Sequence, residues 1–225
     1  MSESLLSPQE VAQLCQAELY SAVLCDTLDS FGLRNQSPQA SLRLLEPDVK
    51  LCGYARVGLY MPVYHDSSDL DVYGEEIDLV DSLKPGDIPV LCCHGMTHIA
   101  PWGELLSTRS KVVGAAGCVT DGSIRDLAMI RKIGFQVAYA GTNPVDTKYR
   151  GKLMLYDVPG QIDRVRIESG DLIFMDEDGM VVLPQDHIQH VVTTALEKVR
   201  KETTIRTELV EGRTLRQIFT DHGIL

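Results

Sequence analysis

Short apolar segments alternate with helix-like segments between residues 103 and 140. The pattern predicts two helices and two strands, over residues 103–111, 124–133, 115–120 and 135–140. The dipeptide Asp121-Gly122 predicts a turn between the strand at 115–120 and the helix that follows it. Such alternation is typical of βαβ units. We therefore expect an α/β fold with a partly parallel sheet.

Helices are expected at both ends of the chain. Ser7, Pro8 and Glu10 combine an N-cap serine, a proline at the first helical position and a glutamate three residues after the cap, which predicts a helix from about residue 8. A second helix is expected over 18–31, closed by Gly32. The C-terminal part predicts a long charged helix over 185–210 and a short one over 215–222.

Strands are expected on both sides of the alternating region. Residues 51–63 and 88–93 have the apolar composition of strands, and four further strands separated by glycine turns are expected near residues 152–158, 163–168, 171–176 and 180–183. This second half is predicted to be antiparallel. The acidic stretch 66–81 has apolar residues every three or four positions, which predicts an amphipathic helix with a solvated acidic face.

Composition narrows the class of protein. The 225 residues carry a formal charge of −11, which disfavours direct binding of nucleic acid, because such proteins concentrate Lys and Arg on one face. No apolar stretch reaches the roughly 18 residues needed to span a bilayer. The six cysteines include no C-x-x-C pair and are expected to be buried, reduced thiols. We expect a cytoplasmic protein with a single domain over 1–225 and no membrane partner.

The residues with the clearest chemical potential follow the strand at 115–120. Ligands of α/β sheets bind at the carboxyl ends of strands, so Arg125 and Asp126 are expected at the mouth of a pocket. An arginine can hold a carboxylate in two hydrogen bonds, and an aspartate oxygen suits Mg²⁺ or Mn²⁺. A structural alternative stays open, in which Ser123 caps the helix and Asp126 completes a capping box.

A second half of the site is expected at residues 103–106. A helix that begins after Gly103 presents free backbone N–H groups, which can bind an anion. On the residues alone, an ordinary helix start without a bound anion is the favoured interpretation. Trp102, the only tryptophan, stands beside them and could line or close the pocket, although packing in the core is favoured.

An acidic residue at Glu104, twenty intervening residues and then Arg125-Asp126 resemble the signature of the RraA-like family. That family includes the class II 4-hydroxy-4-methyl-2-oxoglutarate aldolases. The resemblance continues through further segments along most of the chain, at residues 25–29, 84–87, 170–173 and 176–182.

The resemblance implies an RraA-like swivelling β/β/α sandwich, with a mixed sheet and helices at both termini, assembled as a homotrimer or hexamer with the active site at the subunit interface. By position, it implies Asp126 as the metal ligand and Arg125 as the residue that binds the pyruvyl part. The substrate carboxylate would be held by a cradle made of Gly103, Glu104, Leu105 and Leu106. Glu104 stands where many aldolases have aspartate.

The C-terminal helix of a neighbouring subunit is also implied to contribute an acidic residue. Its candidates are Glu197, Glu202 and Glu208, among which Glu202 is weakly favoured.

The function implied is a divalent-metal-dependent aldolase that cleaves 4-hydroxy-2-oxo acids to pyruvate and can extend to decarboxylating oxaloacetate. Both reactions leave a pyruvate enolate, whose charge Mg²⁺ or Mn²⁺ and Arg125 would stabilise. A lysine Schiff base is a less favoured route, because the lysines fall in polar or helix-end contexts. The alternative is a non-catalytic regulator, like RraA itself, that binds and inhibits the endoribonuclease RNase E, since one fold can host both functions.

Overall fold

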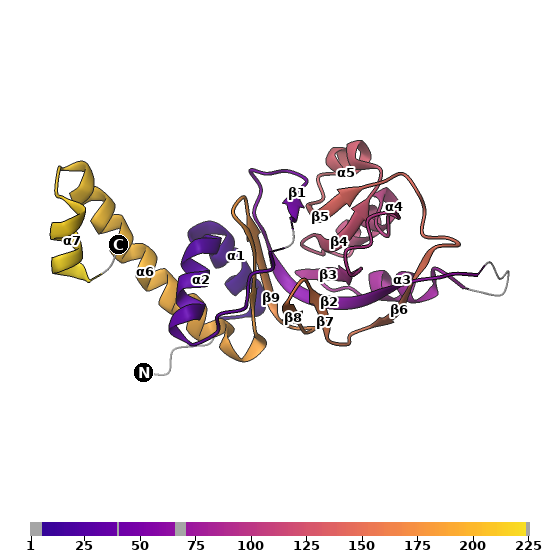
Figure 1. Cartoon of the computed structure of the whole chain (residues 1–225), viewed down its shortest axis with the longest axis horizontal. Coiled ribbons are helices and arrows are strands. Elements are labelled where there is room, and N and C mark those ends of the chain that lie inside the picture. The colour runs from indigo at the N-terminus through magenta and orange to yellow at the C-terminus, as the bar shows by residue number, and fades with distance from the viewer. Residues whose placement is uncertain (1–5, 40, 66–70, 224–225) are drawn as a thin grey trace.

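The computed structural model describes residues 6–39, 41–65 and 71–223 (Figure 1). Its helices are α1 (Pro8–Glu18), α2 (Ser21–Ser30), α3 (Gly74–Asp81), α4 (Glu104–Val112), α5 (Leu127–Ile133), the 3₁₀ turn η1 (Gln185–His187), α6 (Ile188–Val210) and α7 (Leu215–His222). Its strands are β1 (Arg43–Leu44), β2 (Leu51–Pro62), β3 (Asp87–Cys92), β4 (Cys118–Ile124), β5 (Val137–Thr142), β6 (Gly151–Tyr156), β7 (Gly160–Ile162), β8 (Val165–Ile167), β9 (Leu172–Asp176) and β10 (Gly179–Leu183).

One mixed sheet organises the chain, with strand order β1-β5-β4-β3-β2-β9-β10 and β6 paired to β2. The strands β2, β3, β4 and β5 run parallel to one another. The remaining strands of this sheet join it in antiparallel pairs. The mixed α/β architecture and the antiparallel second half predicted from the sequence are therefore confirmed.

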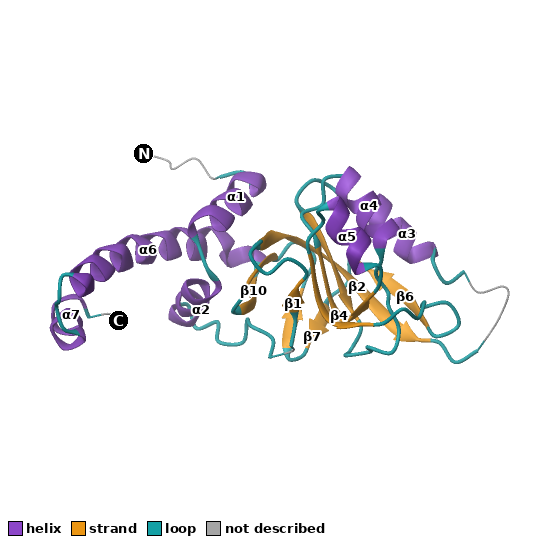
Figure 2. Ribbon diagram, turned by 90° about the horizontal axis from the view of Figure 1, so that it is seen from above, coloured by secondary structure: helices purple, strands orange, loops and turns teal. Residues whose placement is uncertain are grey.

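The two faces of the parallel strands are covered differently. The helices α3, α4 and α5 lie together on one face (Figure 2), where Leu79 and Ile130 join Leu91 in one buried cluster. A separate hairpin, β7–β8, supplies Ile162 and Ile167 to a second cluster built on alternate strand residues. Because successive strand residues point to opposite faces, the two clusters lie on opposite sides of the sheet.

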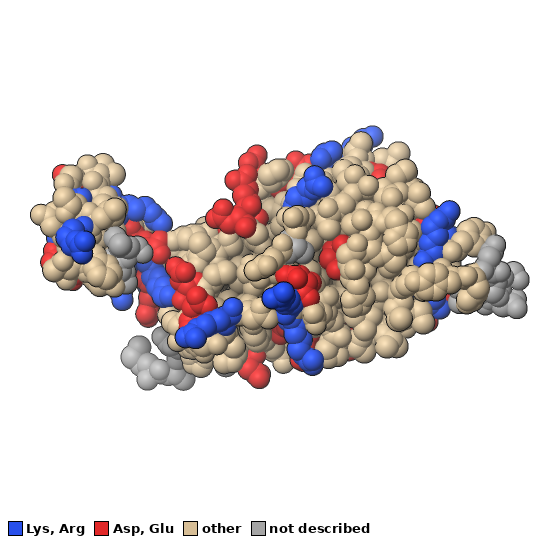
Figure 3. Space-filling view, viewed as in Figure 1, with Lys and Arg blue, Asp and Glu red and all other residues tan. Residues whose placement is uncertain are grey.

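Charged residues are spread over the surface. On the face shown in Figure 3, the Lys and Arg side chains are separated from one another by acidic and uncharged residues. They do not gather into one basic patch on that face.

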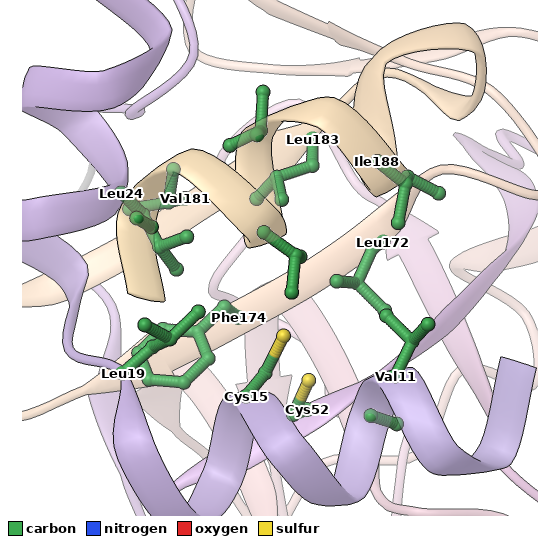
Figure 4. Close-up of a cluster of buried hydrophobic side chains, with 14 of the residues drawn as sticks. Val11, Cys15, Leu19, Leu24, Cys52, Leu172, Phe174, Val181, Leu183 and Ile188 are labelled. Carbon is green, nitrogen blue, oxygen red and sulfur yellow. The ribbon is translucent and has the colours of Figure 1, made fainter. Parts of the chain in front are cut away.

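The terminal helices α1, α2 and α6 pack against β9 and β10. The buried side chains there include Cys15 of α1, Cys52 of β2 and Phe174 of β9 (Figure 4). All six cysteines are free, and all except the half-buried Cys25 are buried. This agrees with the expectation of reduced, buried thiols.

The second half of α6 projects away from the rest of the molecule and turns back through α7 (Figures 1 and 2). Ile205 and Ile218 are buried where these two helices meet. Val210, Leu215 and Phe219 are exposed on the same arm, the last two by 58% and 50%. No described helix has the length and apolarity required to cross a bilayer.

The helices predicted over 18–31 and 66–81 have other bounds in the structure. The helix expected over 18–31 is α2 alone, because α1 continues to Glu18 and extended residues separate the two helices. The helix expected over 66–81 begins only at Gly74, and residues 66–70 lie outside the described part of the chain. The Asp71 side chain accepts hydrogen bonds from the backbone N–H groups of Tyr73 and Gly74, which starts the helix there.

Asp176, at the end of β9, holds the N-terminus of α2. Its carboxylate accepts hydrogen bonds from the Ser21 backbone N–H (2.8 Å) and hydroxyl (2.6 Å), although the N-cap residue of this helix provides no side-chain cap. We expect Asp176→Ala to lower the free energy of unfolding by about 1–2 kcal/mol, as the loss of a helix cap does. Urea denaturation measures this change. Exposed Glu177→Ala is the matched control, and an equal loss in both variants would contradict the capping role.

Candidate functional site

A cavity of about 410 Å³ opens at the carboxyl ends of the parallel strands. Its walls come from α3, from residues 100–106, from the end of β4 and from residues 146–147 after β5. Backbone pairing joins three of these segments. Trp102 bridges Ile124, its carbonyl accepts the Arg125 N–H at 2.9 Å, and Ala100 bridges Asp146.

The end of β4 differs from the predicted turn and helix start. The strand continues through Asp121-Gly122 to Ile124, with a register shift against β5 between Thr120 and Ser123. The continuation is stabilised because the buried Asp121 carboxylate accepts the backbone N–H groups of Cys93 (2.5 Å) and Gly95 (2.9 Å). The Ser123 hydroxyl donates to the Thr97 carbonyl, so the predicted capping box of Ser123 and Asp126 is wrong.

Asp126 instead occupies the N-cap position of α5, with no side-chain cap hydrogen bond. Its backbone is left-handed, at φ 60°, a conformation that residues other than glycine adopt at a cost of about 1–2 kcal/mol. Its side chain lies near Gly103, because a Cβ atom at position 103 would come within 2.8 Å of Asp126 Oδ2. Glycine at 103 therefore preserves the space around this carboxylate.

The cradle predicted at residues 103–106 is the N-terminus of α4. Gly103 is its N-cap and provides no side-chain cap, so the first-turn N–H groups have no partners within the helix. The Glu104 N–H donates to Asp126 Oδ2 at 3.3 Å. The Glu104 carboxylate accepts a hydrogen bond from the Thr108 hydroxyl at 2.7 Å, within the same helix. The structure thus brings the cradle and Asp126 together.

Arg125 lies between two carboxylates that line the cavity. Its guanidinium is 3.4 Å from Asp146 Oδ1 and 3.7 Å from Asp126 Oδ2. The Tyr73 hydroxyl donates to Asp146 Oδ2 at 2.7 Å. Burial raises the pKa of Asp146, but the hydrogen bonds from Tyr73 and Thr147 and the charge of Arg125 outweigh it and hold that pKa below its usual value. Burial and the bond to Asp146 raise the pKa of Tyr73 to about 12.

Sequence reasoning missed Tyr73 and Asp146. One feature of the sequence could have indicated Asp146. It follows β5, the strand beside β4, and the carboxyl ends of neighbouring parallel strands share one edge of the sheet. Tyr73 precedes α3, and its role depends on how α3 packs against the sheet.

Glu76 of α3 was also missed, because the acidic stretch was expected to form a solvated face. The side chain is only 5% exposed, and its Oε1 atom has no hydrogen-bond partner among the described residues. Burial, and secondarily the charge of Asp146, raises the pKa of Glu76 to about 8, although Arg125 opposes the shift. At neutral pH this carboxyl is therefore mostly protonated.

Trp102 and Glu202, which the sequence analysis also singled out, lie in environments unlike that of Arg125 and Asp126. Trp102 is buried, stacks on Phe135 with ring centroids 6.4 Å apart and donates from Nε1 to the Ser107 hydroxyl, which confirms its packing role. Glu202 lies on α6, where it accepts hydrogen bonds from Tyr20 and Arg206. This helix is at the opposite end of the molecule from α3 and α4 (Figure 1), so the structure does not bring Glu202 into the cavity of its own protomer.

Asp126 provides one carboxylate in the cavity with the chemistry of a Mg²⁺ ligand. The described residues contain no group of three or more His, Cys, Asp or Glu that could enclose a metal ion. Mg²⁺ commonly binds through one or two carboxylates and keeps several waters, which fits the partly exposed Asp126 carboxylate and the space left by Gly103. No lysine is among the described residues that line the cavity, which disfavours a Schiff base there.

A family model described as "RraA-like: Aldolase/RraA" matches residues 21–182. The chain is 27% identical over 220 residues to Protein DlpA of Legionella pneumophila, with 98% of this chain and 35% of that protein covered. It spans 54% and 59% of the length of two further curated relatives. A Halorhodospira halophila protein, provisionally named 4-hydroxy-4-methyl-2-oxoglutarate aldolase, is 31% identical over 165 residues, covering 72% of this chain and 94% of that protein.

Solved structures share the fold. The crystal structure of Streptomyces coelicolor RraAS2, described as an unusual member of the RNase ES inhibitor RraA protein family, matches with a TM-score of 0.79 and 27% identity. The match covers 91% of this chain and 99% of that one. The fold class expected from the sequence is thereby confirmed.

The raised pKa of Glu76 predicts a pH dependence of stability. Since this pKa lies above that of an unfolded glutamate, the folded chain binds more protons between about pH 4.5 and pH 8, and its stability falls as the pH rises through that range. We expect Glu76→Gln to remove this fall, so that the variant gains stability relative to wild type from pH 5 to pH 9. Urea denaturation of the metal-free protein at several pH values measures the difference. Half-buried Glu75→Gln should keep the wild-type slope over this range, because the hydrogen bond from Lys152 lowers the pKa of Glu75 and keeps it ionised there. Parallel profiles for all three proteins would contradict the assignment.

Proposed function

The chain belongs to the RraA-like family, and we propose that this member is a divalent-metal-dependent carbon–carbon lyase. Its proposed substrates are 4-hydroxy-2-oxo acids such as 4-hydroxy-4-methyl-2-oxoglutarate, cleaved to pyruvate, with oxaloacetate decarboxylation as a related activity. The observation that carries the proposal is the meeting of the α4 N-terminus, Arg125 and Asp126 in one cavity. The provisional name of the Halorhodospira halophila relative supports the same reaction class.

Each part of the cavity matches a need of that reaction. The N–H groups of Leu105 and Leu106 at the start of α4 would bind the substrate carboxylate, since helix N-termini bind anions. The Glu104 N–H would join them on leaving its 3.3 Å hydrogen bond to Asp126 Oδ2. Arg125 would hold the 2-oxo oxygen and stabilise the negative charge that develops there when the carbon–carbon bond breaks. Asp146 and Asp126 flank the guanidinium and would keep it oriented.

Asp126 is the proposed ligand of Mg²⁺ or Mn²⁺, which when bound would supply Lewis-acid stabilisation of the enolate. Glu104 remains a predicted site residue. In this structure its carboxylate is held by Thr108, so a role toward the substrate would require it to leave that hydrogen bond.

We further propose a homotrimer or hexamer whose active sites lie between subunits. The arm formed by the end of α6 and by α7 supports assembly, because it exposes Val210, Leu215 and Phe219 away from the rest of the protomer. Glu202 could reach a cavity only in a neighbouring subunit. It remains the weakly favoured acidic residue for that contribution, ahead of Glu197 and Glu208. Both Glu202 and Glu208 are paired within this protomer, Glu202 with Arg206 and Glu208 with Arg213 and His222, and would have to leave these partners.

A second candidate function is inhibition of an RNase E-type endoribonuclease. The similarity to Streptomyces coelicolor RraAS2 over 91% of this chain favours it. The two functions separate experimentally, because an inhibitor needs no intact cavity. An RNA-cleavage assay with Asp126→Ala distinguishes them, since inhibition through a surface would survive this substitution.

The lyase proposal predicts a sharp loss of turnover in two variants. We expect Asp126→Ala to abolish metal-dependent turnover, and Arg125→Ala to lower kcat/KM at least a hundredfold, about 2.7 kcal/mol. Pyruvate release from 4-hydroxy-4-methyl-2-oxoglutarate and from oxaloacetate, coupled to lactate dehydrogenase and NADH, measures both. Parallel assays with EDTA establish the metal requirement.

Arg109→Ala is the matched control for Arg125→Ala, because Arg109 is an exposed arginine of α4 that pairs with Asp81. It should retain wild-type kinetics. Full activity of Asp126→Ala at saturating Mg²⁺ would refute the proposed site. Absence of pyruvate release by wild type from either acid would favour the inhibitor instead.

A further inference from the structure

The α3 wall of the cavity carries a buried acid that the roles assigned above leave unused. Glu76 lines the cavity together with Arg125 and Asp126, which belong to the β4–α5 junction. Its Oε1 atom is buried and lacks a hydrogen-bond partner among the described residues. Leaving a buried polar atom unpaired is destabilising, so such an atom in a native site calls for an explanation.

The other acidic groups near Glu76 are already engaged. Asp146 accepts the Tyr73 hydroxyl and pairs with Arg125, which keeps it ionised. Tyr73 is committed to Asp146 and is a weaker acid than usual. Glu76 alone among these three combines a free carboxyl oxygen with a proton at neutral pH.

The proposed reaction needs a proton donor of this kind. Breaking the bond between C3 and C4 leaves the bonding electron pair in the pyruvate enolate, and C3 must then gain a proton to become the methyl group of pyruvate. A neutral carboxylic acid in a partly apolar pocket is a known solution for delivering a proton near pH 7. Tyr73 and Ile77, with Glu76, form the α3 side of this pocket.

We propose that Glu76 is the general acid that protonates C3 of the pyruvate enolate, an inference that rests on the proposed lyase function. In the step, the O–H bond of Glu76 breaks, the C–H bond at C3 forms, and Glu76 is left as a carboxylate. In aldol cleavage the 4-hydroxyl group loses its proton to water as the C4 carbonyl forms. Glu76 regains a proton from water, so the cycle consumes no net proton.

The reverse step gives a direct assay. The Glu76 carboxylate would remove a proton from C3 of bound pyruvate, so the enzyme should exchange the methyl protons of pyruvate with D₂O. Proton NMR follows this exchange in the presence of Mg²⁺. We expect Glu76→Gln to slow it at least about a hundredfold, the lower range for loss of a general acid or base.

The pH profile adds a readout that a purely structural role would not move. The titratable and charged groups facing Glu76 are Tyr60 of β2, Tyr73 at the start of α3, Cys93 after β3, Cys118 of β4, Arg125 after β4 and Asp146 after β5. Burial raises the pKa of both thiols and both phenols, which therefore stay neutral near pH 8. We expect exchange by wild type to rise with pH through about 8, and exchange by Glu76→Gln to lack this rise.

One control variant and the wild-type measurement separate the possible failures. Glu75→Gln, on the same helix and paired with Lys152 at 2.9 Å, should exchange pyruvate protons like wild type. Absence of metal-dependent exchange in wild type would overturn both the lyase and the role of Glu76. Wild-type exchange that survives unchanged in a folded Glu76→Gln would overturn the role of Glu76 alone.

Should Glu76→Gln fail to fold, Glu76→Asp provides the same test, because it retains an acid but withdraws it by one methylene group. We expect slower exchange, and we expect the exchange rate to rise at a different pH from that of wild type. Exchange identical to wild type in rate and pH profile would contradict the proposal.

Discussion

Backbone pairing between Trp102 and the end of β4 holds the candidate site together. The bridge of Trp102 to Ile124, with the hydrogen bond from Arg125 N–H to the Trp102 carbonyl, fixes the start of α4 against the segment that carries Asp126. Trp102 is itself fixed, because its ring is buried against Phe135. The geometry of the cavity thus depends on a buried aromatic side chain and two short stretches of backbone. Because these contacts hold the walls in place, the side chains that line the cavity are available for binding and catalysis.

Much of the framework was predictable because it is local. The capping box at Ser7, the alternation between residues 103 and 140 and the glycine turns of the second half all specify structure over a few residues. The end of β4 was not predictable in the same way. Asp121-Gly122 has the composition of a turn, but the Asp121 carboxylate satisfies backbone N–H groups after β3, and that contact exists only in the folded sheet.

The candidate site also combines residues that the local sequence indicates with residues that only the folded chain brings together. Gly103 to Leu106, Arg125 and Asp126 were predicted because their spacing resembles a family signature, and they line one cavity, although their local conformation was partly mistaken. Glu76 escaped notice because an acidic residue in an acidic stretch is usually solvated. Its burial arises when α3 packs onto the sheet beside residues from three other elements, which periodicity alone cannot show.

The left-handed backbone of Asp126 has an evolutionary consequence. Glycine would adopt this conformation without strain, so Asp126→Gly would relieve a cost of about 1–2 kcal/mol while deleting the carboxylate. Stability and the proposed metal-binding role therefore favour different residues at this position. A lineage that lost the need for the carboxylate would be free to drift toward glycine here, and would become more stable as it did so. If Asp126 is the metal ligand that we propose, the residue at this position would distinguish relatives that keep the chemistry from relatives that keep only the fold.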